Sequence, residues 1–154
     1  MTCGTPSLSK ALRRQLSRVA DRSAADWRLL LSVVGLLVRV RLGLTFTSLK
    51  TVQGWLEREA AATASATSPQ RLARTVRTGA RLVPGASCLT QALTYQALLH
   101  RSGVASTIKL GVRRQGSGLA AHAWVVIDGR VALGGTAAVR REFAQIVQFG
   151  PIAR

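Results

Sequence analysis

The dipeptide Asp128-Gly129 stands between two short apolar segments, and this arrangement constrains the fold more than any other feature of the chain. Residues 119–127 (LAAHAWVVI) are apolar on both faces of a strand, which is typical of a central strand in a sheet. Asp-Gly is a strong signal for a two-residue hairpin turn, so residues 130–134 should return as an antiparallel neighbour. Residues 104–113 alternate apolar and polar side chains, which predicts a third strand with one buried face.

A helix that is apolar on most sides precedes these strands. Residues 88–101 contain no helix breaker, Ser87 is a suitable N-cap, and Ser102-Gly103 ends the pattern. We therefore expect this helix to run through the core and to pack on the sheet, in an α+β fold preceded by N-terminal helices. The N-terminal helices are predicted at Trp27–Leu42, capped by Asp21 or Ser23, at 46–62 and at 70–82, after a basic arm at 1–20.

The composition allows one sizeable core and gives the chain a strong positive charge. Hydrophobic residues make up 47% of the 154 residues, which is enough for one folded domain. Lys and Arg total 22 against 6 Asp and Glu, for a net charge of +16. Such a surface attracts anionic partners, which include nucleic acid, acidic proteins or peptides, and anionic membranes. Charge alone does not choose among them.

Cysteine usage and hydropathy predict a cytoplasmic protein. The two cysteines, Cys3 and Cys88, form neither a disulfide framework nor a zinc-site spacing, and we predict no metal and no cofactor. The N-terminus lacks the apolar core of a secretory signal. The most hydrophobic segment, Leu29–Val38, falls short of the roughly 20 apolar residues that cross a bilayer. It therefore predicts a buried helix, with membrane-surface contact as the alternative, and no transmembrane segment.

Cys88 and His122 are the candidate catalytic residues. Cys88 opens the predicted core helix, where unpaired N–H groups and a partial positive charge favour thiolate over thiol. His122 lies within an otherwise apolar strand, where an imidazole needs a hydrogen-bond partner. A lone core cysteine or a lone buried histidine is usually structural. A cysteine at the head of a helix packed on a sheet, with a histidine on the central strand, is the arrangement that a thiolate–imidazolium pair requires.

The segments SCLTQALTYQALLHRSG, TIKLGV and AHAWVVIDGRVALGG, in this order, carry a family resemblance. The chain resembles the transglutaminase-like, papain-like cysteine proteases of lasso peptide biosynthesis, the leader peptidases, most strongly over 84–135. The resemblance implies that Cys88 is the nucleophile and His122 the general base. It also implies a lasso precursor peptide as substrate, cut at its leader boundary through a thioester, a separate leader-recognition protein, and a lasso cyclase acting on the released core.

One element of the family's triad is missing from this sequence. If 128–129 form the turn, Ile127 pairs with Arg130, and continuing the ladder places Gly135 opposite His122. The acid of such triads should lie at 134–135, but the sequence there reads ALGGTAAV. Asp128 lies roughly 20 Å from His122 along the strand, so we interpret it as a turn residue.

Other groups could orient the histidine instead. The alternatives are a main-chain carbonyl near Gly134 or Gly135, and Thr136 or a glutamine after a register shift. Gln91 and Gln96 are possible oxyanion donors, although the main-chain N–H of the nucleophile is the better candidate. Loss of the acid should slow the reaction more than abolish it, because the nucleophile and the base do the chemistry.

The organisation predicted from these patterns has two parts, a helical region at 1–69 that docks a partner and a protease core at 70–154. Two other functions remain open. The charge would suit a basic nucleic-acid-binding module, although the arginines are scattered, aromatic residues are few and no reading motif is present. A catalytically impaired scaffold of the same family is the other alternative. Our expectation is a peptidase that does not bind nucleic acid.

Overall fold

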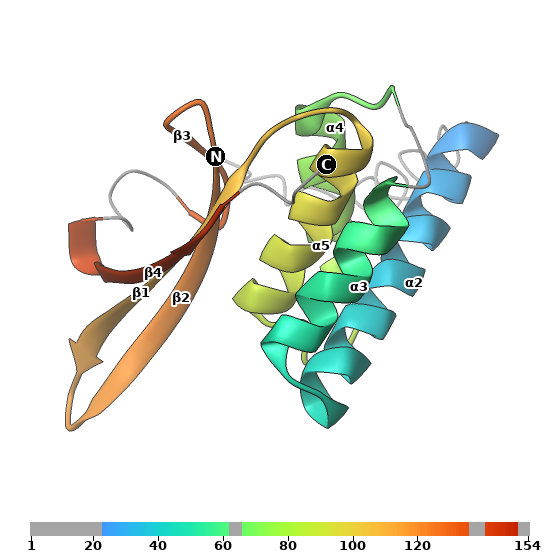
Figure 1. Cartoon of the computed structure of the whole chain (residues 1–154). Coiled ribbons are helices and arrows are strands. Elements are labelled where there is room, and N and C mark those ends of the chain that lie inside the picture. Colours follow the sequence, from blue (N-terminus) through green and yellow to red (C-terminus); the bar gives the residue numbers. More distant parts are fainter. Residues whose placement is uncertain (1–22, 62–65, 136–140, 151–154) are drawn as a thin grey trace, which may run out of the picture.

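The chain forms a layer of helices packed against one antiparallel sheet (Figure 1). The structure is a computed structural model that describes residues 23–61, 66–135 and 141–150. Within these residues the elements follow one another as α2 (Ala24–Phe46), α3 (Leu49–Ala61), α4 (Pro69–Ala80), α5 (Cys88–Arg101), β1 (Thr107–Gln115), β2 (Gly118–Ile127), β3 (Arg130–Leu133) and β4 (Ala144–Phe149). The predicted α+β class is confirmed, and the arm at 1–20 lies outside the described residues.

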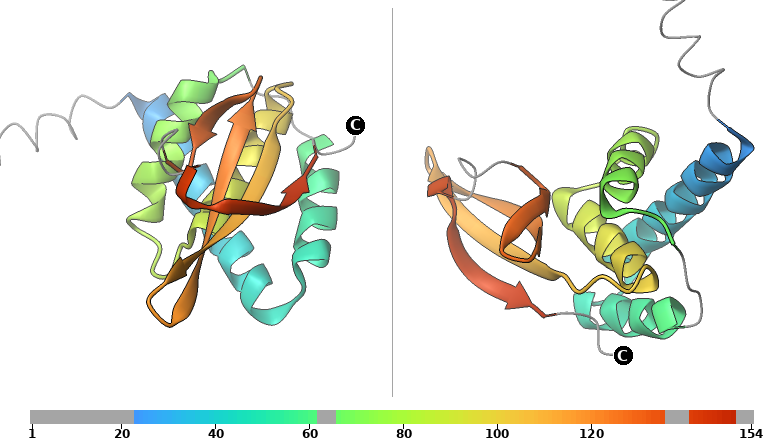
Figure 2. Two further views of the ribbon diagram at one scale, coloured as in Figure 1. Left: turned by 90° about the vertical axis from the view of Figure 1, so that its left-hand side faces the viewer. Right: turned by 90° about the horizontal axis from the view of Figure 1, so that it is seen from above.

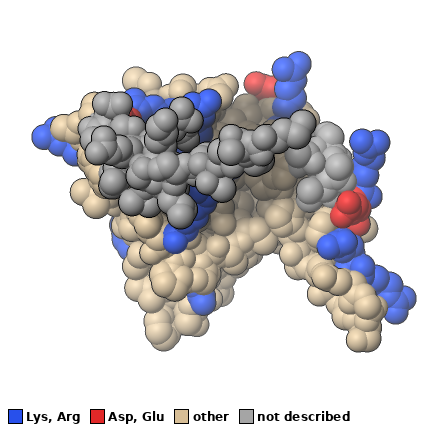
Figure 3. Space-filling view, turned by 180° about the vertical axis from the view of Figure 1, so that it is seen from behind, with Lys and Arg blue, Asp and Glu red and all other residues tan. Residues whose placement is uncertain are grey.

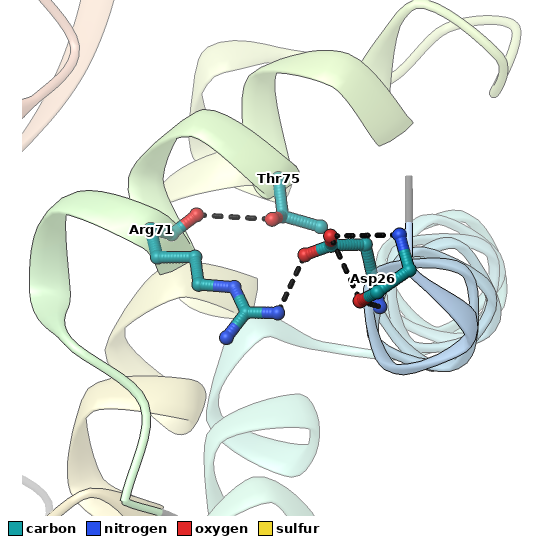
Figure 4. Close-up of polar contacts among 4 residues, drawn as sticks. Asp26, Arg71 and Thr75 are labelled. Carbon is teal, nitrogen blue, oxygen red and sulfur yellow. Dashed lines mark hydrogen bonds and ion pairs between the residues drawn. The ribbon is translucent and has the colours of Figure 1, made fainter. Parts of the chain in front are cut away.

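The helix boundaries follow local signals in the sequence. Ser23, one of the two predicted caps, is the N-cap of α2, and it forms a capping box with Asp26. Asp26 also accepts a hydrogen bond from the guanidinium of Arg71, which joins the first turn of α2 to α4 (Figure 4). The Arg71 contact, with a smaller contribution from Ser23, lowers the pKa of the Asp26 carboxyl from its ordinary value of 3.8.

Helix α5 is the centre of the fold. Every residue from Ala92 to Leu99 is buried, because α2, α3 and α4 contact the helix on one side and the sheet covers the other (Figures 1 and 2). The prediction that this helix runs through the core is confirmed. One hydrophobic core joins residues from both sides of the 69/70 boundary, including Val33, Leu37, Leu72, Tyr95, Ile108 and Val125.

The sheet has the strand order β3-β2-β1-β4, so β2 is a central strand as predicted. Ile127 pairs with Arg130, and the turn residues Asp128 and Gly129 have φ values of 48° and 74°, as a two-residue turn of this kind requires. A bulge between Val125 and Val126 then shifts the ladder, and β3 ends at Leu133. The expected pairing of Gly135 with His122 is therefore wrong, because the bulge adds a residue to one side of the hairpin.

Strand β4 has no counterpart among the predicted elements. It pairs antiparallel with β1, from Ile108 opposite Phe149 to Val112 opposite Ala144. Its side chains are mostly exposed, so the segment lacks the apolar alternation that identifies a half-buried strand. Pairing with β1 therefore decides its conformation, and the local sequence does not.

Helix α2 has two apolar faces, of which only one is covered in the described chain. Its core face consists of Leu30, Val33, Leu36, Leu37 and Val40. The opposite face exposes Trp27, Leu31, Val38, Leu42 and Phe46. The hydrophobic run that was expected to be buried is therefore buried on one side only. By length and composition, α2 is also the one described helix that could cross a membrane, a test that core helices pass as well.

Candidate functional site

The thiol of Cys88 lies in the first turn of α5. The hydroxyl of Ser87, the N-cap, accepts a hydrogen bond from the N–H of Thr90 at 3.2 Å, and the main-chain oxygen of Ser87 accepts one from Gln91 at 3.0 Å. Cys88 is partly buried against the core and is a free cysteine. The helix end therefore presents the sulfur beside N–H groups that have no acceptor within the helix.

The two glutamines considered as oxyanion donors are held elsewhere. The amide nitrogen of Gln91 donates to the main-chain oxygen of Ala86 at 3.2 Å. The amide nitrogen of Gln96 donates to Ser106 and Gly150, and its side chain is buried. Both side chains serve the fold, so the main-chain N–H of Cys88 remains the best candidate for an oxyanion donor.

His122 has a definite hydrogen-bond partner in the described chain. Its Nε2 lies 2.6 Å from the main-chain oxygen of Gly134, the residue after β3. A carbonyl near Gly134 or Gly135 was one of the open alternatives to an acid, and the structure selects Gly134. Because the carbonyl oxygen only accepts, Nε2 carries a proton in this contact, so a neutral ring would keep the lone pair on Nδ1.

Two aromatic rings flank the imidazole. The ring of Trp124 stacks on His122 with a centroid separation of 6.3 Å, and Phe143 approaches it at 5.4 Å. Trp124 lies two residues after His122 on β2 and so shares its strand face, whereas Phe143 comes from outside that strand. Phe143 immediately precedes β4, so its approach to His122 depends on the unpredicted pairing of that strand with β1. No local sequence signal could have identified it.

Cys88 and His122 lie at different sides of β2. Ala123 and Val125 belong to the hydrophobic core that contains α5, so their strand neighbours His122 and Trp124 point to the other face. No hydrogen bond joins Cys88 to His122 in the described part of the chain. From Gly118 to Trp124, β2 has no neighbour on its β3 side among the described strands, so this edge of β2 is unpaired beside His122. The catalytic pairing stays a prediction.

No carboxylate of the described residues forms a hydrogen bond or ion pair with His122, and Glu142, next to Phe143 in the sequence, is paired with Arg113. Asp128 occupies the hairpin turn, six residues after His122, in agreement with its interpretation as a turn former. Residue 134, one of the two positions where an acid was expected, is a glycine. Its main-chain oxygen contacts Nε2 of His122 instead. Among the described residues, no group of three or more His, Cys, Asp and Glu side chains could hold a metal ion.

A groove of about 800 Å³ lies between α4 and the β2–β3 hairpin. Its lining includes Gln70, Tyr95, Ile127, Asp128 and Arg130. Neither candidate catalytic residue lines this groove. The groove therefore lies beside the hairpin turn, and His122 lies six residues before the turn residue Asp128 on β2.

The family comparison agrees with this architecture. The sequence profile of the transglutaminase-like superfamily matches residues 30–148, which is more than half of the chain. The match includes the Cys88 helix, the His122 strand and helix α2 from Leu30 onward. No curated protein and no solved structure shows significant similarity to the chain. A thiol at the head of a central helix, a sheet packed on that helix and the extent of the match lead to one conclusion: this chain belongs to the transglutaminase-like superfamily.

Proposed function

We propose that this protein is a cysteine peptidase that removes the leader from a ribosomally made lasso precursor peptide. The observation that carries the proposal is the free thiol of Cys88 at the N-terminus of the central helix, in a chain of the transglutaminase-like superfamily. A helix N-terminus stabilises negative charge on the sulfur and on an oxyanion formed beside it. The resemblance of residues 84–135 to lasso leader peptidases supplies the substrate.

The reaction would proceed in two acyl transfers. The thiol proton of Cys88 passes to Nδ1 of His122 while the sulfur attacks the carbonyl carbon at the leader–core junction. The C–N bond then breaks, the leaving amine of the core takes the proton from His122, and the leader remains on the sulfur as a thioester. Water hydrolyses the thioester with His122 as base, which releases the leader carboxylate and restores the thiol.

The proton transfer requires the two side chains to come together. His122 lies on the outer face of β2 and Cys88 at the helical side, so the proton must pass between imidazole and sulfur at the unpaired edge of β2. Catalytic hydrogen bonds are often long before substrate binds and tighten in the complex. We therefore propose that a bound precursor peptide lies along this edge and closes the distance.

The outer face of α2 is the proposed docking surface for the leader-recognition protein. Leu31 and Phe46 expose 66% and 78% of their surface, and Val38 and Leu42 lie between them at helical spacing. A continuous exposed apolar stripe of this kind is typical of an interaction surface. The lasso cyclase is proposed as the enzyme that takes over the released core, in the cytoplasm, where both cysteines stay reduced.

The experiment is a cleavage assay with purified full-length protein. A lasso precursor and its leader-recognition protein are incubated separately with the wild-type chain, with Cys88→Ala and with Cys3→Ala. The masses of the products are measured by mass spectrometry. We expect a single cut at the leader boundary with the wild type and with Cys3→Ala, and no cut with Cys88→Ala. Undiminished cleavage by the Cys88→Ala protein would overturn the proposal.

A basic nucleic-acid-binding module is the second candidate, supported by the charge of the described surface. Basic side chains are spread over the face in Figure 3, with few acidic ones among them. On α4, the outward positions carry Arg71, Arg74 and Arg77, and Arg71 is already paired with Asp26. Substituting Cys88 would leave nucleic-acid binding unchanged, so that variant separates the two functions. An impaired scaffold would bind the precursor and its partner but leave the precursor uncut even as wild type.

A further inference from the structure

We infer that Gly134 is the positioning residue of His122, and that its main-chain oxygen replaces the carboxylate of a cysteine–histidine–acid triad. The inference rests on the proposed peptidase function. The contact that supports it is the 2.6 Å separation between Nε2 of His122 and the oxygen of Gly134. A carbonyl oxygen in this position requires a proton on Nε2, so the neutral ring keeps the lone pair of Nδ1 for the thiol proton of Cys88.

The backbone at Gly134 leaves no room for a side chain. Its φ of +93° lies in the region that favours glycine. A Cβ atom there would lie 2.6 Å from the main-chain oxygen of Ala123 and 2.7 Å from Cα of Trp124. Both neighbours are backbone atoms of β2, which cannot move aside as a flexible side chain could. The close approach that brings the carbonyl to His122 therefore excludes an aspartate at the same position.

A second glycine, Gly111, leaves room for the two aromatic residues beside the imidazole. Gly111 of β1 pairs with His122, and a Cβ at Gly111 would lie 2.9 Å from both the Trp124 ring and the Cβ of Phe143. Without a side chain at this position, the two aromatic residues pack over β1 and flank the imidazole. The aromatic contacts limit the rotation of the ring, and the carbonyl of Gly134 selects its orientation and tautomer.

The chemical consequence concerns the charged form of the base. A carboxylate would stabilise the imidazolium by its full negative charge, whereas a carbonyl offers only a dipole. The orienting function is kept and the charge stabilisation is reduced. The departure of this sequence from the family's triad is therefore compatible with a working histidine.

The test measures the tautomer of His122 by ¹⁵N NMR. The sample is the full-length Cys88→Ala protein with ¹⁵N-labelled imidazole nitrogens. We expect the Nε2–H tautomer to dominate the neutral ring. In Gly134→Ala, the displaced carbonyl should give a mixture of the two tautomers, while Gly129→Ala should leave the tautomer unchanged. Gly129 is a matched control because it also has a positive φ, at +74°, but nothing lies near its missing Cβ.

The cleavage assay separates this inference from the proposed function. Gly134→Ala in the otherwise wild-type chain should cut the precursor more slowly by on the order of 10²-fold and alter the pH profile of cleavage. If Gly134→Ala does not fold, the tautomer of His122 measured in the protein that retains Gly134 decides the inference. A dominant Nδ1–H form would then overturn it. Cleavage together with Nδ1–H would refute the positioning and keep the peptidase. An Nε2–H ring in a protein that cuts nothing would refute the peptidase and keep the positioning.

Discussion

The hydroxyl of Tyr95 donates a hydrogen bond to the main-chain oxygen of Pro69 at a distance of 3.0 Å, and this bond ties the central helix α5 to the start of α4. Tyr95 is 1% exposed, so its hydroxyl would otherwise lose its bond to water without replacement. The contact joins segments 26 residues apart in the sequence. It therefore holds the helix that carries Cys88 against its neighbour.

We expect Tyr95→Phe to lower the free energy of unfolding by about 0.5–1.5 kcal/mol, because the carbonyl of Pro69 loses its donor. Burial raises the pKa of the Tyr95 hydroxyl to about 12, although the charge of Arg77 opposes the shift. The unfolded chain then loses this proton near pH 10 while the folded chain keeps it. Stability should therefore fall between about pH 10 and 12, and urea titrations across this range should show a smaller fall in Tyr95→Phe.

The N-cap of α5 should contribute to stability independently of catalysis. Ser87→Ala removes the acceptor of the Thr90 N–H, which should cost about 1 kcal/mol in the free energy of unfolding. Ser117 is exposed in the β1–β2 turn, and Ser117→Ala serves as the control. Equal urea midpoints for the two variants would contradict the role of Ser87 as the cap.

The contact between Asp26 of α2 and Arg71 of α4 should weaken at low pH. Because Arg71 and Ser23 lower the pKa of Asp26, the link contributes fully above the unfolded value of 3.8 and is lost as pH falls through the lower folded value. Asp26→Asn should therefore show less acid destabilisation than the wild type below about pH 4 in thermal unfolding. Glu57→Gln, which changes an exposed acid of α3, should behave like the wild type. Added salt should weaken the link, since it lies at the surface.

The two faces of α2 should respond differently to the same substitution. Leu37 is fully buried, so Leu37→Ala should lower the free energy of unfolding by about 2–5 kcal/mol. Leu31 is 66% exposed, and Leu31→Ala should change the stability of the isolated chain by less than about 0.5 kcal/mol. Calorimetry of the isolated chain measures both changes.

A charged substitution at Leu31 tests the proposed docking surface. If the leader-recognition protein binds the outer face of α2, Leu31→Glu should weaken its binding in titration calorimetry while the chain stays folded. A Leu31→Glu protein that binds its partner with unchanged affinity would assign the docking site to another surface.

The sequence by itself determined the elements whose signals are local. The caps at Ser23 and Ser87 and the turn at Asp128-Gly129 each depend on residues within a few positions, so they could be predicted. The apolar pattern of 88–101 likewise predicted a central helix, since a helix without a polar face must be covered on all sides. Cys88 and His122 could be chosen as candidates on the same local grounds.

Only the tertiary structure decided the surroundings of those candidates. The bulge at Val125/Val126 moved the register, the carbonyl of Gly134 became the partner of His122, and β4 brought Phe143 to the imidazole. None of these contacts leaves a signal in the side-chain pattern, because each depends on backbone atoms or on strands paired across a long separation. The exposed side of α2 was decided in the same way, since hydropathy measures how apolar a helix is but not which of its faces a neighbour covers.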